Sequence, residues 1–160
     1  MKMSDTIKHP YFGTLDQGNG LHWRGTAVCS GRSVPVDMIS AAPRSAAEVD
    51  AMFAFIRDIA RFDEIARQRL QPADEAVALY VEHHLAELSS EDLMAAFGTS
   101  NRSQLTMAGF LRQLELRRVG LYPASGTAVF DYGLNGAITQ YVLAVTLGQD
   151  GSVHDVSMES

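Results

Sequence analysis

Apolar and polar positions alternate with a period of two near the start of the chain. A short β-like stretch at 9–16 is followed by a Gly/Asn-rich turn signal. Residues 21–29 then alternate Trp23, Gly25, Ala27 and Cys29 with Arg24, Thr26 and Val28. The pair Ser30-Gly31 has the composition of a two-residue hairpin turn, and the alternation then resumes. Pro35 cannot donate to a strand ladder. These patterns predict about three strands within residues 9–39, with the strand around Pro35 at a sheet edge.

The spacing of apolar positions changes to three and four between residues 45 and 116. Ser45 and Glu48 have the separation of a capping box, which predicts a helix start. The apolar stripe that follows comprises Val49, Met52, Phe53, Ile56, Ile59 and Phe62. We expect this helix to run to about Leu70, because Pro72 suits the first turn of a second helix. A third helix should end near Gly98 and a fourth should begin at Ser103.

A period of two returns between residues 118 and 158. Strands are predicted at 118–122, 127–132, 138–147 and 152–158. The third of these is strongly apolar and should be central, whereas the half-polar last strand should be its edge partner. The order of the blocks predicts one α+β domain over residues 1–160, in which an antiparallel sheet of about three N-terminal and about four C-terminal strands packs on the central helices.

The two ends of the chain resemble a family of small bacterial domains of unknown function. The resemblance rests on the opening HPYFGTLD followed by a strand with Trp23, and on the ending ITQYVLAVTLGQDGSVHDVSMES. It covers nearly the whole chain and its motifs are hydrophobic and turn-like, so it implies a fold and brings no activity or catalytic residue with it.

Composition and charge exclude several classes of protein. The formal net charge of −6 argues against nucleic acid as a partner, because phosphate binding depends on Lys and Arg patches. No apolar run is long enough for a membrane span, and the start MKMSDTIKHPYFG lacks the apolar core of a signal peptide. We therefore expect a cytoplasmic protein that contacts neither membrane nor nucleic acid. The single cysteine, Cys29, excludes an internal disulfide.

Candidate chemical groups are few and scattered. His83 and Glu87 have the i, i+4 spacing of two ligands on one helix face, but the other histidines are dispersed along the chain. Cys29 falls among apolar residues at a strand end, which favours a buried side chain over a nucleophile, and His84 shares an apolar helical stripe. No phosphate loop, dinucleotide fingerprint or Gly-x-Ser-x-Gly motif occurs. The sequence thus predicts no catalytic residue, no metal and no cofactor.

The segment between Arg69 and Arg102 contains acidic residues and no Lys or Arg. Its six acids are Asp74, Glu75, Glu82, Glu87, Glu91 and Asp92. Asp74, Glu91 and Asp92 fall at expected helix starts, where carboxylates complement the helix dipole. Two interpretations of the segment are open: a solvated helix face, or a docking surface for a basic protein partner with Glu75, Glu82 and Glu87 as its contacts.

Two classes of function follow from these observations. The first is a non-catalytic binding or regulatory protein, immunity-like or accessory, that acts through protein–protein contact. The alternative is a small enzyme or ligand-binding protein with a pocket between sheet and helices lined by Tyr122, Tyr132 and Tyr141, so enzymatic activity is left open. A homodimer is expected through the half-polar face of the long strand, which carries Gln140, Val142, Ala144 and Thr146.

Overall fold

The computed structural model describes residues 6–160; residues 1–5, part of the segment in which no signal peptide is predicted, lie outside the described residues. The strands are β1 (Thr6–His9), β2 (Gly13–Asp16), β3 (Leu21–Cys29), β4 (Arg32–Ser40), β5 (Glu115–Tyr122), β6 (Thr127–Gly133), β7 (Val142–Gly148) and β8 (Val153–Glu159). The helices are α1 (Ala46–Arg57), α2 (Ile59–Gln68), α3 (Glu75–Glu87), α4 (Ser90–Phe97) and α5 (Met107–Arg112), with a 3₁₀ turn at Arg102–Gln104. The predicted α+β class is confirmed.

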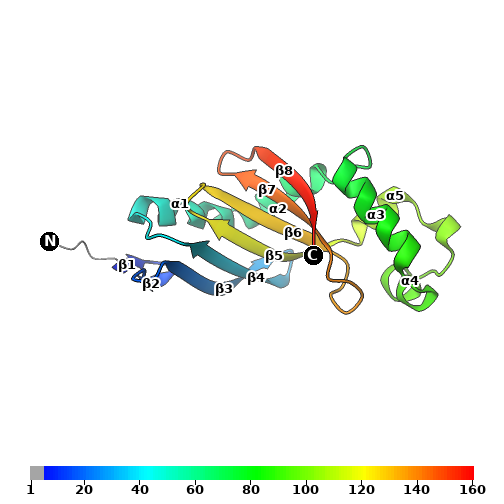
Figure 1. Ribbon diagram of the computed structural model, residues 1–160, viewed down its shortest axis with the longest axis horizontal. Coiled ribbons are helices and arrows are strands. Elements are labelled where there is room, and N and C mark those ends of the chain that lie inside the picture. Colours follow the sequence, from blue (N-terminus) through cyan, green and yellow to red (C-terminus); the bar gives the residue numbers. More distant parts are fainter. Residues whose placement is uncertain (1–5) are drawn as a thin grey trace.

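The main sheet has six strands in the order β3-β4-β5-β6-β7-β8 (Figure 1). All neighbours pair antiparallel except β4 and β5, which pair parallel over residues 36–38 and 119–121. The prediction of a wholly antiparallel sheet is wrong at this pair, because the helical segment between β4 and β5 is a crossover connection that returns the chain to the end of the sheet where β4 began. Residues 9–16 also differ from the prediction, since β1 and β2 form a separate two-stranded sheet.

Pro35 lies in an interior strand, which corrects its predicted place at a sheet edge. β4 has neighbours on both sides, with Pro35 opposite Thr26 of β3. Pairing with β5 begins only at Val36. The missing N–H of Pro35 therefore falls where β4 has no second partner, so the residue is accommodated as if it lay on an edge.

The helices cover one face of the sheet and one of its ends. Ser45 and Glu48 form the predicted capping box, with the Glu48 N–H donating to Ser45 Oγ over 3.1 Å. The single helix predicted from Ser45 to about Leu70 is divided into α1 and α2, because Asp58 between them adopts a non-helical conformation (φ −108°, ψ 32°). In Figure 1, α1 and α2 lie behind the sheet, and α3, α4 and α5 gather at one end of it.

The core lies between the helices and one face of the sheet. The largest wholly buried side chains are Tyr80, Tyr132, Phe55, Phe62, Phe110, Phe130, Met38 and Met52. The other sheet face carries no helix and holds the alternate residues of each strand, among them Arg24, Asp37 and Arg118. Within residues 6–160, no helix combines the length and apolar character needed to cross a membrane.

Candidate functional site

A groove runs between helix α3 and strand β8. Its volume is about 620 Å³, and it is lined by Glu75, Ala76, Ala78, Leu79 and Glu82 of α3 and by Val156, Ser157 and Met158 of β8. α3 packs against β8 more extensively than against any other strand. The groove therefore lies at the end of the sheet order, where β8 has β7 as its one recorded neighbour among the described strands.

The residues on the α3 side follow from the two-faced pattern of this helix. One face buries Val77, Tyr80, Val81 and His84. Glu75, Leu79 and Glu82 are spaced by four and three residues on the opposite face, so they point away from the core together. Asp74 caps the helix by accepting from the N–H groups of Ala76 and Val77, which fixes where the first turn begins.

Leu79 is the apolar centre of this surface. It is 56% exposed, more than any other leucine, isoleucine or methionine among the described residues. Leu79 was not predicted as a surface contact, although an apolar residue four positions after Glu75 and three before Glu82 is unusual on a solvated polar face. Met158 lines the groove only because α3 packs against β8, and no residue near Met158 in the sequence indicates this contact.

The glutamates beside Leu79 carry charge that the described part of the chain does not neutralise. None of the ion pairs recorded among residues 6–160 involves Glu75, Glu82 or Glu87. The structure brings Glu75 and Glu82 together on the groove. Glu87 lies at the C-terminal end of α3, exposed and outside the groove lining.

The three tyrosines expected to line a pocket are not brought together. Tyr132 is wholly buried on the helix-covered side, and its hydroxyl donates to Asp63 Oδ1 over 2.6 Å. Tyr122 belongs to the helix-free side and borders a concavity there. Tyr141 precedes β7, is 38% exposed and packs its ring against His83, with ring centroids 4.9 Å apart.

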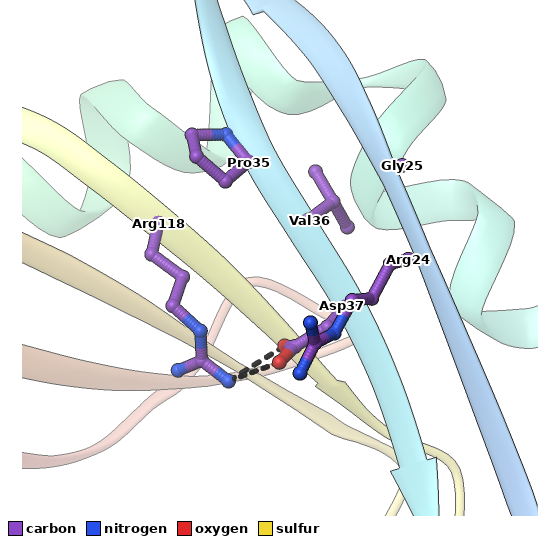
Figure 2. A pocket seen from close by; sticks show the side chains of 6 residues that line it. All are labelled: Arg24, Gly25, Pro35, Val36, Asp37 and Arg118. Atoms are coloured by element: carbon purple, nitrogen blue, oxygen red, sulfur yellow. Dashed lines mark hydrogen bonds and ion pairs between the residues drawn. The ribbon is translucent and has the colours of Figure 1, made fainter.

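A row of alternating charges crosses the helix-free face. Both carboxylate oxygens of Asp37 accept from one Arg118 nitrogen, Nη2, over 2.6 Å, and Nη1 donates to Asp131 over 3.4 Å. Arg24 is the β3 register partner of Asp37, and a hollow of about 290 Å³ opens among these residues (Figure 2). Burial opposes the charge of Arg118, yet hydrogen bonding to Asp37 and its charge leave the Arg118 pKa above its usual value. Asp37, Arg118 and Asp131 are thus paired with one another, which makes this part of the row a structural feature of the sheet.

The buried titratable groups are occupied by internal hydrogen bonds. Burial lowers the pKa of His84, whose ring bonds the Tyr80 carbonyl and the Thr139 hydroxyl. Burial and the nearby Asp63 raise the pKa of the Cys29 thiol, which keeps it protonated and a poor nucleophile. Across residues 6–160, no three His, Cys, Asp or Glu side chains are grouped so that they could hold a metal ion.

Comparison with protein-family models, with curated proteins and with solved structures gave no match. The site is therefore interpreted from its own geometry. Among the surface features described, the α3–β8 groove alone combines an exposed apolar side chain, unpaired carboxylates and a sheet edge.

Proposed function

We propose that this chain is a non-catalytic binding or regulatory protein, immunity-like or accessory in role, that acts by contact with a basic protein. The observation that carries the proposal is the exposed Leu79 between Glu75 and Glu82, facing the edge strand β8. An apolar centre with a charged rim is the usual anatomy of a protein–protein interface. A cytoplasmic place of action belongs to the same proposal.

Charge supports the choice of partner. Carboxylates without a basic neighbour attract a positively charged surface, and the resulting increase in association rate falls as ionic strength rises. We also propose that the chain belongs to the family of small bacterial domains of unknown function that its sequence resembles. That family brings no activity with it. The alternative of a tyrosine-lined pocket has no single cavity to support it, because Tyr122 and Tyr132 lie on opposite sides of the sheet.

The proposal is tested by placing a photo-crosslinking amino acid at position 79 in cells that express the protein. Position 94 is the matched control, because Met94 on α4 is exposed to a similar degree, 51%, and lies outside the groove. We expect a partner that crosslinks at position 79 and not at 94. The purified partner should bind the wild-type chain and bind a Glu75→Gln/Glu82→Gln variant more weakly. Equal crosslinking at the two positions, or equal affinity of wild type and variant, contradicts the proposal.

A homodimer through the helix-free sheet face is a second proposal. Val142, Ala144 and Thr146, three of the residues expected to form such a surface, lie on that face together with Gln140 around a concavity of about 540 Å³. A sheet face that no helix covers in the monomer is available to a second copy.

A further inference from the structure

The two edges of the six-stranded sheet are finished differently. On the outer side of β3, the first hairpin closes over the strand: the Tyr11 hydroxyl donates to the Thr26 carbonyl over 3.2 Å, and the Phe12 ring packs edge-on against Trp23 at 4.9 Å. β8 ends the sheet at the other side, and within residues 6–160 no further strand pairs with it. One row of its backbone N–H and C=O groups is therefore available to an added strand.

The sequence of β8 discourages one kind of pairing and favours another. The strand contains neither Pro nor Lys, two residues that commonly block edge strands. Its charged residues are Asp155 and Glu159, both exposed, with Glu159 opposite Val142 and Asp155 opposite Thr146 on the helix-free side. In an antiparallel pair of two β8 strands centred on Ser157, Asp155 of one copy would face Glu159 of the other, which is repulsive. A basic strand meets the opposite charge at the same positions.

The groove would accommodate the side chains on the other face of such an added strand. Val156 and Met158 alternate with the residues of the helix-free side and line the groove with Leu79. A strand paired to β8 would place every second side chain over these apolar residues and the intervening ones beside Asp155 and Glu159. Glu75 and Glu82, on the groove side, add a longer-range attraction for a positively charged segment.

We propose that β8 binds an extended segment of a basic partner by strand addition, with apolar residues on the helix side alternating with Lys or Arg on the helix-free side. This inference rests on the proposed binding function and names its mode. The main-chain hydrogen bonds give affinity, and the alternation of apolar and basic residues gives specificity.

The first test uses a synthetic probe. A fluorescein-labelled eight-residue peptide that alternates lysine with valine is titrated with the protein, and its anisotropy is followed. One control peptide has a central valine replaced by proline, and a second has the same composition in one lysine block and one valine block. We expect the alternating peptide to bind at least about tenfold more tightly than either control, since proline removes a ladder donor and the block order places charge in the groove. Equal affinities for the three peptides overturn strand addition.

Protein variants locate the binding. Leu79→Ser and the double variant Glu75→Gln/Glu82→Gln should each weaken the alternating peptide by about threefold to tenfold, whereas Met94→Ser should leave its affinity unchanged. An equal loss in Met94→Ser and Leu79→Ser contradicts the placement in the groove. Light scattering of the mixture checks that the peptide does not instead induce a dimer through β8, which would also contradict it.

Amide hydrogen exchange separates strand addition from side-chain docking. Because N–H groups of an edge strand point alternately inward and outward, binding should slow exchange at alternate residues between 155 and 159. The same measurement is made with the partner captured at position 79. If that partner binds through Glu75 and Glu82 but leaves the β8 amides unprotected, strand addition is wrong and the binding function stands. If no partner crosslinks at position 79, the binding function itself fails.

Discussion

The Nδ1 atom of His84 lies 2.7 Å from the carbonyl oxygen of Tyr80, one helical turn earlier in α3. A carbonyl only accepts, so Nδ1 carries the proton, and Nε2, 2.9 Å from Thr139 Oγ1, accepts from that hydroxyl in the neutral ring. The side chain is 1% exposed, as the helical stripe of α3 predicts. The imidazole is thus a neutral link between α3 and the segment that precedes β7.

This link makes the stability of the protein depend on pH. Burial lowers the His84 pKa in the folded state, so the unfolded chain binds more protons below about pH 6.5. The free energy of unfolding should therefore fall as the pH drops from 7.5 to 5.5, with a slope of up to about 1.4 kcal/mol per pH unit from this group. Urea unfolding at several pH values measures it. His84→Leu should flatten the slope; a slope unchanged in His84→Leu contradicts the assignment.

The same substitution tests whether His84 is structural. His84→Leu removes the bond to Thr139, while the Tyr80 carbonyl keeps its helical hydrogen bond, so we expect a loss of about 1–2 kcal/mol at pH 7.5. Zinc should leave the melting temperature of wild type and variant unchanged. A strong increase with zinc that disappears in the variant would establish a metal site instead.

Tyr132→Phe should be more costly than the same change at Tyr141. The Tyr132 hydroxyl donates to the buried Asp63 carboxylate, which also accepts from Arg67. Removing that donor should lower the free energy of unfolding by about 1–3 kcal/mol. Tyr141→Phe is the control, because its ring is partly exposed and a surface change of this kind stays within about 0.5 kcal/mol. Equal effects of the two variants would mean that the Asp63 bond does not stabilise the fold.

The two carboxylates beside Arg118 should differ in their contribution to stability. Asp37 accepts two short bonds from Arg118, whereas Asp131 accepts one over 3.4 Å and has a pKa that burial raises. Burial therefore disfavours the charged form of Asp131. We expect Asp131→Asn to leave the melting temperature nearly unchanged and Asp37→Asn to lower it by several degrees. The reverse order would show that Arg118 depends mainly on Asp131.

The acidic residues of α3 should not contribute equally to binding. The triple variant Glu75→Gln/Glu82→Gln/Glu87→Gln should fold normally, because all three side chains are exposed. It should bind the partner captured at position 79 more weakly than wild type does, and the more so at low salt. Nearly all of this loss should appear in Glu75→Gln/Glu82→Gln and little in Glu87→Gln, since only the first two line the groove. An equal loss from each glutamate would indicate a diffuse electrostatic effect.

Assembly is checked by light scattering. A homodimer through the helix-free face predicts about twice the 17.4 kDa chain mass at high micromolar concentration. A single-chain mass at that concentration contradicts the dimer and leaves the groove proposal intact.

Local chemistry explains which parts of the fold were predictable. The capping box, the hairpin at Ser30-Gly31 and the αL glycine Gly98 depend on residues within a few positions of one another, and each was predicted. The bounds of β3 were predicted as well, because its alternation is uninterrupted. Elements that depend on distant partners were not. The parallel pair β4–β5 joins residues more than eighty positions apart, and nothing near Pro35 indicates where pairing with β5 begins.

The candidate site shows the same division. Glu75 and Glu82 were identified from the absence of nearby Lys and Arg, which is visible in the sequence. The apolar side of the groove was not, because Met158 reaches Leu79 only through the packing of α3 on β8. The three tyrosines were predicted to share a pocket because they are the same type of residue. In the structure, alternation along the strands puts Tyr122 and Tyr132 on opposite faces of the sheet, and Tyr141 lies before the start of β7.

The parallel pair between β4 and β5 also bears on how the chain folds. The β3–β4 hairpin and the β5–β8 meander each form from neighbours in sequence. Among residues 6–160, the two halves of the sheet are joined by three register pairs and by the ion pairs Asp37–Arg118 and Arg32–Glu115. Closing that junction brings together residues more than eighty positions apart, and contacts of such high sequence separation form slowly. We expect it to be the last part of the sheet to form during refolding, a sequence of events that pulse-labelling hydrogen exchange at residues 36–38 and 119–121 resolves. Two half-sheets meeting at a short seam would give this chain its slowest folding step at the place where its two halves join.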